Sequence, residues 1–539
     1  MDTKALRQKV LDLAIRGKLV PQDPNDEPAS VLLERIRQQK QQMVKDGKLK
    51  AKDIKNDTII FVGEDNLHYE KFADGSVKCI EDEIPFDLPD GWAWSRLLPL
   101  TIKIGAGSTP TGGAAVYSDF GVKFIRSQNV YNDGLVLDDI AYISEDINHK
   151  KSGSIVKPKD ILLNITGGSI GRCALVPDDF DTANVNQHVI IIRLVEPALR
   201  QYIHSVITSP YIQEQIFSRQ VGSGRGGLSA ETLSTFLVAV PPIQEQSVIQ
   251  DKLRQCISSI STIAAEKTDI TRLVSAAKAK ILDLAIRGQL VPQDPADEPA
   301  SVLLERIRAE KEELIKQGKI KRDKKESVIF RGEDNSYYEK IGDDVRCIDE
   351  EIPFDIPDTW EWVRLENCCS KEIRRGKSPK YTERSGTLVF AQKCNTKYNG
   401  IDVGLALNLD ESTLSRYPAD EYMQDGDVVV NSTGTGTLGR VGFYRMADNC
   451  LGLPIVPDSH VTVVRGFSSI QAFYLYAFMK ASQSELEKKG EGSTNQKELK
   501  ALTLKEMLVP MPPVSEQKRI EAAIAKAFSL IAMIEKSLS

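Results

Sequence analysis

The chain carries one 27-residue stretch twice. Residues 11–37 return at 282–308 with only two positions changed, a shift of 271 in a chain of 539 residues. Solenoid repeats have periods of about 20 to 50 residues, so this spacing is far too long for one. The sequence therefore predicts two domain-sized halves that arose by duplication.

The likeness between the halves is uneven. Glu83–Asp87, followed by two tryptophans, answers to Glu351–Asp355, but the similarity fades after Arg96 and Arg364. Only short islands survive beyond that point, such as Asn-x-Thr-Gly and Pro-Pro-x-x-Glu-Gln. Each half is thus a shared frame around roughly 150 diverged residues. We expect a common architecture with separate specificities; the alternative is that one insert has drifted after losing its role.

Composition limits the class of protein. With 41% hydrophobic and 27% charged residues the chain is an ordinary globular one. No apolar run approaches the roughly 20 residues of a membrane span, and the first residues lack an apolar signal core, so we expect a cytoplasmic protein with no membrane contact. None of the eight cysteines lies in a CxxC pair, which argues against a zinc site or a disulfide frame.

A long helix is predicted between the halves. From Ile249 to Leu284 apolar positions recur at steps of four and three, interrupted only by Lys267, as in a coiled-coil seam. Gly288 and Pro292 then act as stop signals. A helix from Gln244 to Arg287 would be roughly 65 Å long. It could hold two domains apart.

The chain ends repeat this helix in two pieces. Residues 516–539 match its first part and residues 2–19 its second part. If the pieces meet, the molecule closes into a pseudo-twofold ring with two antiparallel helices. Packing is the first purpose of such an apolar stripe, and a partner site is the alternative.

With these repeats and helices, the sequence resembles the specificity subunit of type I restriction-modification systems over nearly its whole length. The resemblance rests on the repeated LDLAIRG-x-LVPQ block, the Pro-x-Gly-Trp-x-Trp segment at Pro89–Trp94 with its counterpart at Pro357–Trp362, and the Pro-Pro-x-x-Glu-Gln segments that lead into long helices. Each motif alone is weak. In this order and twice, they are specific.

The resemblance implies an α+β fold: two mixed α/β target recognition domains, separated by two long antiparallel coiled-coil helices in a pseudo-twofold, circularly permuted arrangement. Each recognition domain would read one half of a split DNA target, with the helices setting the gap. The implied boundaries, in chain order, are an N-terminal helix piece at 1–20, a spacer at 21–90, recognition domain 1 at 91–243, the central helix at 244–290, a second spacer at 291–358, recognition domain 2 at 359–513 and the C-terminal helix at 514–539.

Charge is a constraint on DNA binding. The whole chain is at −6, residues 91–243 hold thirteen basic and thirteen acidic side chains, and residues 359–513 hold nineteen and eighteen. Affinity for DNA comes largely from phosphate contacts. A neutral domain must gather its cations on one face or take affinity from partners, so we expect weak, salt-sensitive binding by this chain alone.

Polar loops in matching places are the candidate DNA contacts. Their Arg, Lys, Asn and Gln side chains suit the edges of guanine and adenine, and the small or cationic ones suit phosphates. For a single residue, a strand that ends in a polar loop is an equal alternative, and an isolated histidine is more often structural. The candidates are Ser108, Thr109, Arg126, Ser127, Gln128, Asn129, Arg172, Asn186, Gln187, His188 and Arg225 in the first half, and Arg374, Arg375, Lys377, Gln392, Lys393, Asn395, Arg440, Ser493, Thr494, Asn495, Gln496 and Lys497 in the second.

One motif matches the glycine pattern of a dinucleotide-binding loop. Gly434–Gly439 fits GxGxxG, but such a loop must open a helix, and the residues after Arg440 read as a strand. We interpret it, like the matching segment at 164–172, as a glycine-rich turn between two strands.

The nearly identical repeat segments are expected to make the same contacts twice, as two identical partner subunits would require. The candidate partner-binding residues are Leu13, Ile15, Arg16 and Leu19 in the first copy, and Leu284, Ile286, Arg287 and Leu290 in the second.

No catalytic set, metal site or nucleotide loop is visible, so we expect a non-catalytic subunit. The resemblance places S-adenosylmethionine on two modification subunits and ATP with Mg²⁺ on restriction subunits, with double-stranded DNA as the shared ligand. Two other classes remain: a symmetric coiled-coil scaffold that reads no DNA, and an enzyme with two active sites, which the divergence of the inserts disfavours.

Overall fold

The computed structural model describes residues 2–112, 116–220, 226–318, 320, 322, 326–397, 400–434, 436–491 and 497–538. The chain divides into two compact units, Met1–Lys267 and Thr268–Ser539. The boundary lies inside α8, a single helix of 44 residues at Ile243–Ile286. This confirms the helix predicted from Gln244 to Arg287, and each unit therefore contains one part of it.

The first unit holds the following elements. Its other helices are α1 (Thr3–Ile15), α2 (Ala29–Lys45), α3 (Ala51–Ile54), α4 (Glu145–Lys150), α5 (Arg200–Thr208), α6 (Pro210–Ser218) and α7 (Ala230–Ser234). Its strands are β1 (Ile59–Val62), β2 (His68–Lys71), β3 (Val77–Cys79), β4 (Ala93–Arg96), β5 (Thr101–Ala106), β6 (Val122–Ile125), β7 (Val130–Tyr131), β8 (Gly134–Leu135), β9 (Ala141–Ile143), β10 (Ile155–Val156), β11 (Ile161–Asn164), β12 (Cys173–Leu175), β13 (Ala183–Val185), β14 (Val189–Leu194) and β15 (Leu237–Val240).

The second unit repeats this order with changes. Its helices are α9 (Ala300–Lys316), α10 (Ala472–Ala481), α11 (Gln483–Lys488), α12 (Ala501–Lys505) and α13 (Val514–Leu538). Its strands are β16 (Ser327–Arg331), β17 (Tyr337–Ile341), β18 (Asp344–Cys347), β19 (Glu361–Arg364), β20 (Tyr381–Thr382), β21 (Leu388–Phe390), β22 (Leu407–Leu409), β23 (Val428–Asn431), β24 (Val441–Phe443), β25 (Ile455–Pro457), β26 (Val461–Val464) and β27 (Leu508–Met511).

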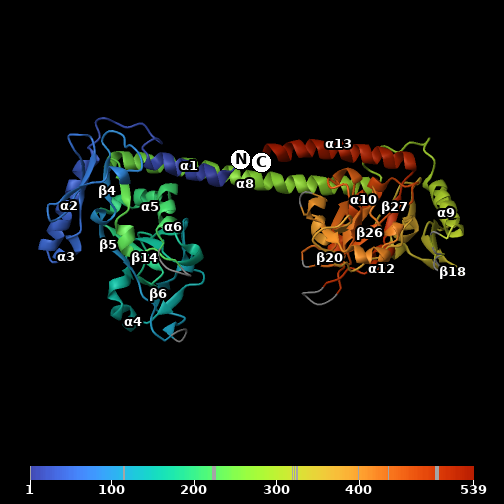
Figure 1. Ribbon diagram of the computed structural model, residues 1–539, viewed down its shortest axis with the longest axis horizontal. Coiled ribbons are helices and arrows are strands. Elements are labelled where there is room, and N and C mark those ends of the chain that lie inside the picture. The colour runs from blue at the N-terminus through green and yellow to red at the C-terminus, as the bar shows by residue number, and fades with distance from the viewer. Residues whose placement is uncertain are drawn as a thin grey trace. The chain divides into compact units, whose positions relative to one another are not determined.

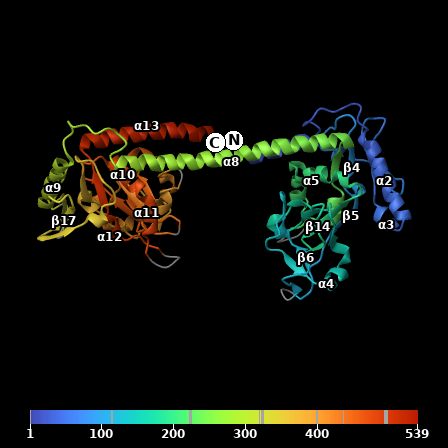
Figure 2. The ribbon, with the colours of Figure 1, turned by 180° about the vertical axis from the view of Figure 1, so that it is seen from behind.

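Each unit contains a pair of packed helices. In the first, α1 runs along the N-terminal part of α8 (Figure 1), where Val10 and Ala14 join Ile249 and Leu253 in one buried cluster. In the second, α13 runs along the C-terminal part of α8 (Figure 2), and Lys278 Nζ lies 2.8 Å from Glu535 Oε1. The predicted helix pieces at the two chain ends are therefore confirmed as helices that pack on α8.

The buried face of α8 departs from the predicted seam near its end. Leu282 and Ala285 are buried there, whereas Leu284, which continues the four-three spacing, is half-exposed. The cause is the neighbouring domain: Leu282 and Ala285 pack against Trp360, Tyr474 and α13 in one cluster. Packing on a globular domain thus overrides the coiled-coil pattern in the last turns.

The spacer segments fold into small modules. Each has a helix, α2 or α9, and a three-stranded antiparallel meander, β1-β2-β3 or β16-β17-β18. A buried lysine at the matching place holds each helix to the chain that follows: Lys40 Nζ lies 2.7 Å from Asp57 Oδ2, and Lys311 Nζ lies 3.1 Å from Glu326 Oε1. The spacers are therefore structured and alike.

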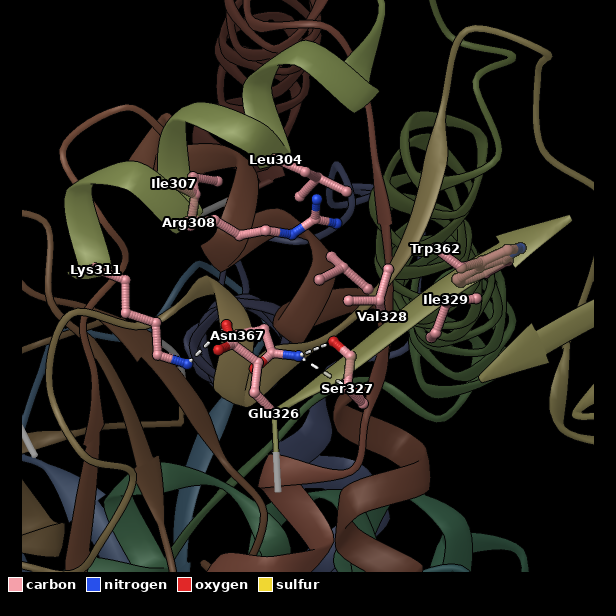
Figure 3. A pocket seen from close by; sticks show the side chains of 11 residues that line it. Leu304, Ile307, Arg308, Lys311, Glu326, Ser327, Val328, Ile329, Trp362 and Asn367 are labelled. Carbon is pink, nitrogen blue, oxygen red and sulfur yellow. Dashed lines mark hydrogen bonds and ion pairs between the residues drawn. The ribbon is translucent and has the colours of Figure 1, made fainter. Parts of the chain in front are cut away.

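A small cavity separates α9 from β16 in the second module (Figure 3). Lys311 reaches across toward Glu326, and Asn367 Nδ2 donates to the Ser327 carbonyl oxygen at 2.9 Å. Its volume is about 20 Å³. Ligand pockets usually measure about 300 Å³ or more, so this cavity is a packing feature and not a small-molecule site.

Each recognition domain begins and ends on one two-stranded ribbon. In the first unit β4 pairs antiparallel with β15, so that Arg96 faces Leu237. In the second, β19 pairs with β27, so that Arg364 faces Leu508. Between these strands the first domain folds into the four-stranded sheets β10-β13-β6-β9 and β12-β11-β14-β5. The second domain has the sheets β20-β22-β21-β25 and β24-β23-β26. The expected mixed α/β domains are confirmed.

The frame around the domains is held by the same contacts twice. Trp92 Nε1 donates to Glu245 Oε2 at 2.8 Å, and Trp360 Nε1 donates to Glu516 Oε2 at 2.9 Å. Burial raises the pKa of both glutamates. Gly288 ends α8 with φ +67, and a Cβ on it would collide with the ring of Pro357. A left-handed conformation and a close contact at one position both require glycine.

Candidate nucleic-acid interface

A pair of parallel strands gathers two predicted loops in the first domain. β6 and β13 pair in parallel, with Val185 opposite Ile125. The carboxyl ends of parallel strands lie at the same edge of a sheet. Arg126–Gln128 and Asn186–His188 therefore leave the sheet side by side, although about 60 residues separate them in sequence.

The second domain repeats this arrangement. β21 and β25 pair in parallel, with Phe390 opposite Pro457. Gln392 and Lys393 follow the first of these strands, and the segment Asp458–His460 follows the second. The structure thus brings the matching candidates of the second half to the matching sheet edge.

A third loop joins each edge. In the first domain the Thr109 backbone nitrogen donates to Gln187 Oε1 at 3.0 Å, and Lys151 Nζ donates to Ser108 Oγ at 2.6 Å. In the second domain Arg375 forms an isolated bridge with Thr462, and Lys377 forms one with Asp458. Gly107 and Gly376 each lie so close to the opposite backbone that a Cβ would clash with it.

The glycine-rich turns lie at the same edge. Thr166 Oγ1 is 2.6 Å from His188 Nδ1, and Thr433 Oγ1 is 2.7 Å from His460 Nδ1. Both turns connect antiparallel strands, β11 to β12 and β23 to β24. The prediction that GxGxxG is a turn between strands is confirmed, because β24 follows it and not a helix.

The last predicted loops are only partly described. Arg225, Ser493, Thr494, Asn495 and Gln496 lie outside the described residues. The residues beside them are placed: Gly227 forms a bridge with Thr166, and Glu498 forms one with Thr433. Lys497 is exposed.

Three predicted asparagines hold turns in the free protein. Asn129, 2% exposed, donates through Nδ2 to the Val136 carbonyl oxygen and accepts from the Arg126 backbone nitrogen, both at 3.0 Å. Asn395, 1% exposed, donates to the Arg440 carbonyl oxygen at 3.0 Å. Asn186 is also buried and accepts from the His188 backbone nitrogen, a position that Asp458 fills beside His460. Their burial argues against base contacts, because these polar atoms are already used.

Other candidates have partners but keep exposed surface. Arg126 Nη2 donates to the Asp139 carbonyl oxygen at 2.9 Å, and Gln128 Nε2 donates to Asp139 Oδ2 at 2.8 Å. The Arg172 guanidinium lies 4.5 Å from the centre of the Tyr131 ring. Arg440 Nη1 donates to the Asn395 carbonyl oxygen at 2.8 Å. Ser108, Thr109, Gln128, Gln187 and Lys393 are exposed, whereas Ser127, His188 and Gln392 are half-exposed.

Four cations, with acidic partners, gather at the edge of the second domain. The buried carboxylate of Glu421 lies 3.2 Å from Lys371 Nζ and 3.7 Å from Lys377 Nζ, and it also pairs with Arg374. Three cations thus surround one buried anion, and two of them also have exposed acidic partners: Lys371 Nζ lies 3.9 Å from Asp420 Oδ2, and Arg374 Nε lies 3.4 Å from Glu372 Oε2. Arg375 pairs separately with Glu498 at 3.1 Å. Although the domain is neutral overall, its cations gather where a phosphate backbone would need them.

The predicted partner-binding residues divide by burial. Ile15 and Ile286 are buried in the cores of their own units, which argues against a direct partner contact by either. Arg16 and Arg287 lie 4.4 Å and 4.3 Å from the ring centres of Phe86 and Phe354, and they pair with Asp12 and Asp283. The four candidate leucines, Leu13, Leu19, Leu284 and Leu290, are half-exposed.

The described residues contain neither a candidate metal site nor a candidate membrane-spanning helix. No group of three or more His, Cys, Asp or Glu side chains among them could hold a metal ion. No helix in the described part of the chain is long and apolar enough to cross a membrane.

Residues 101–272 and 357–538 match the family model described as "Type I restriction modification DNA specificity domain". These two ranges make up more than half of the chain. The chain belongs to this family. Both matches contain the parallel strand pairs, β6 with β13 and β21 with β25. The polar loops at the carboxyl ends of these strands, which we call the sheet-edge clusters, also lie within the matches.

Relatives in the specificity family support this assignment. The chain is 29% identical over 405 residues to the Type I restriction enzyme EcoAI specificity subunit of Escherichia coli, a match that covers 67% of this chain and 62% of the relative. It is 24% identical over 592 aligned positions to the EcoEI specificity subunit, covering 99% of this chain and 90% of that one. A solved chain from work on complex assembly and conformational transition of the type I R-M system shares the fold, with a TM-score of 0.52 at 18% identity over 84% of this chain and 94% of that chain.

In this member of the specificity family, sequence reasoning missed several residues at the edges. Lys371 and Glu421 organise the cations of the second domain, and Lys151 contacts Ser108. The hydroxyl groups of Thr166 and Thr433 form hydrogen bonds with the rings of His188 and His460. Thr166 and Thr433 could have been found from the sequence, because Asn-x-Thr-Gly is one of the few short segments that both inserts share.

Proposed function

We propose that this chain is the DNA-recognition subunit of a type I restriction-modification complex, and that residues 91–243 and 359–513 each read one half of a bipartite double-stranded target. The observation that carries the proposal is the polar loop cluster at one sheet edge of each unit. The clusters share their architecture and a Thr–His contact, but most of their exposed side chains differ, as two readers of different sequences require.

The exposed side chains suggest how the reading is divided. Gln128 and Gln187 offer amides to base edges in the first domain, whereas in the second Gln392 offers an amide and Lys393 an ammonium group. The cations around Glu421 and Glu498 suit phosphates, which position a protein without specifying sequence. With neutral domains, the chain takes much of its affinity from partners, so it binds DNA weakly by itself and loses that binding as salt rises.

The partners are two modification subunits and the restriction subunits. S-adenosylmethionine belongs on the modification subunits and ATP with Mg²⁺ on the restriction subunits, while this chain, itself non-catalytic, chooses where methylation or ATP-dependent cleavage occurs. The helix pair of the second unit offers one docking place: Leu273, Leu530 and Met533 are 62%, 58% and 68% exposed on α8 and α13. Exposed apolar side chains on paired helices suit a partner helix.

The test exchanges one recognition domain at a time. Cells that make this chain with its partner subunits are sequenced for methylated bases, first with the natural chain and then with 91–243 or 359–513 replaced by the same domain of a relative. We expect a split motif of which only the corresponding half changes. A motif that stays unchanged would overturn the proposal, and an assembly that methylates no fixed motif would identify the chain as a scaffold.

A further inference from the structure

The meander of the first unit has two unlike faces. Side chains alternate between the faces of a strand, and directly paired residues share a face. The strand register pairs Phe61 with Tyr69 and Tyr69 with Cys79, and it pairs Ile59 with Lys71 and Lys71 with Val77. These six residues therefore form one face of the sheet, which we call the outer face.

The opposite face of the sheet is covered at its centre, although Val62 at its end is 56% exposed. Glu70 lies on it, 5% exposed, and pairs with Arg96 of β4 at 2.8 Å. The outer face has no such cover: Ile59, Phe61 and Val77 are 42%, 40% and 51% exposed. Phe61 and Tyr69 stack with ring centres 5.9 Å apart. This meander therefore presents an aromatic and aliphatic surface to solvent.

The second unit repeats this face residue for residue. Val328, Phe330, Tyr338, Lys340, Val345 and Cys347 occupy the matching register positions. Phe330 and Tyr338 stack at the same 5.9 Å, and Phe330 and Val345 are 40% and 53% exposed. Apart from the change of isoleucine to valine, both outer faces have the same side chains, whereas the sheet-edge clusters of the recognition domains differ.

The charge around the outer faces selects the kind of partner. Residues 59–83 hold seven acidic and two basic side chains, and residues 327–351 hold eight and three, so that each segment carries a net charge of −5. Such a field repels a phosphate backbone. It attracts a protein surface whose apolar centre is edged with lysine and arginine.

We propose that each outer face docks one copy of the same protein subunit through an apolar surface edged with basic side chains. The face occurs twice with the same residues, so its partner enters the assembly in two copies. Both meanders lie outside the ranges 101–272 and 357–538 that match the DNA specificity domain, which separates this surface from DNA reading. The inference rests on the proposed function in that it assumes a complex with partner subunits.

The outer faces contain their own reporters. Cys79 and Cys347 lie on them and are exposed, while Cys450 is exposed on the second recognition domain. The rate of alkylation by a maleimide is measured for each thiol by mass spectrometry, in the chain alone and in the complex with modification and restriction subunits. We expect alkylation of Cys79 and Cys347 to slow at least about tenfold in the complex and that of Cys450 to change less than about twofold.

Substitution of the aromatic centre tests the same surface. The variant F61S/F330S removes the largest exposed apolar side chains of both faces, and F217S is the matched control because Phe217 is 54% exposed on α6. Buried aromatic side chains are frequent energetic centres of protein interfaces. We expect F61S/F330S to weaken binding of one partner subunit at least about tenfold, an effect that grows with the number of faces changed, and F217S to leave it within about twofold.

The outcomes separate the two proposals. If the complex assembles and methylates a split motif while Cys79 and Cys347 stay reactive, this inference is overturned and the proposed function stands. Slowing of both thiols by DNA alone, or by self-association of the chain, would also overturn it. If the natural chain forms no complex with its partner subunits, the proposed function itself fails.

Discussion

The two sheet edges differ most in how they carry charge. At the edge of the first domain small neutral residues, Ser108 and Thr109, contact Lys151 and Gln187. At the edge of the second, Arg374 and Lys377 surround the buried carboxylate of Glu421. The framework beneath the edges is nevertheless the same in both. The two halves of this chain therefore differ in their polar loops but keep the buried contacts that position those loops.

The largest expected effect comes from breaking that common framework. Arg193 pairs with buried Asp160 in the first domain and Arg465 with buried Asp427 in the second, each through two contacts of 2.7 Å. Removing one partner of a buried pair costs about 3 kcal/mol or more, since the other charge is left uncompensated. We expect D160A and D427A to lower the free energy of unfolding by similar amounts, each in its own unit, as measured by urea denaturation.

The control for this pair is D448A. Asp448 pairs with Arg445 on the surface, where an ion pair contributes about 0.5 kcal/mol. A loss below about 1 kcal/mol for both D160A and D427A would mean that the two frameworks are not held by these pairs.

A smaller effect should separate the two edges. In the triple variant R374A/R375A/K377A the second domain loses three cations, and each phosphate contact contributes about one unit to the salt slope of binding. We expect DNA affinity of the assembled complex to fall about tenfold at 0.1 M salt, with a shallower salt dependence, in fluorescence anisotropy. The neutral counterpart S108A/T109A should change affinity less than about threefold. Equal losses for both variants would contradict the difference in charge between the edges.

The smallest effect concerns the spacers. Hydrogen bonds from Arg364 and Arg346 lower the pKa of Glu339 to about 2, below its ordinary 4.5. Burial opposes ionisation of Glu70 in the first spacer, but hydrogen bonds from Arg96 outweigh it and its pKa is lowered as well. Lys78, the counterpart of Arg346, contacts Glu83 and not Glu70. Because the folded pKa is depressed, the stabilisation is full above about pH 5 and is lost as pH falls toward 2.

We therefore expect R346K to lower the free energy of unfolding at pH 7 by on the order of 1 kcal/mol and to remove part of the loss seen between pH 5 and pH 3. The reciprocal variant K78R should steepen the loss in the first unit. Identical pH profiles for R346K and the natural chain would show that Arg346 does not help to hold Glu339 ionised.

Much of the frame could be predicted from the sequence, because its signals are local. The four-three spacing and its flanking signals predict both ends of α8 to within one residue. The turn at Gly434–Gly439 follows from the strand pattern beside it. Pairing of β6 with β13 could not be predicted, since nothing local says which distant strands meet. The roles of Asn129 and Asn395 were equally hidden: an amide that suits adenine suits a buried turn just as well. Leu282 and Ala285 are buried by a domain that the helix pattern does not describe.

The ribbons formed by β4 with β15 and by β19 with β27 have a consequence for inheritance. Because the two ends of each recognition domain leave the frame as neighbouring strands, the whole insert is a closed loop on a fixed base. Recombination within the repeated flanks can replace such a loop without moving the ends it is attached to. A gene of this form can exchange one recognition domain through a crossover in each flank, while the repeated frame is passed on unchanged.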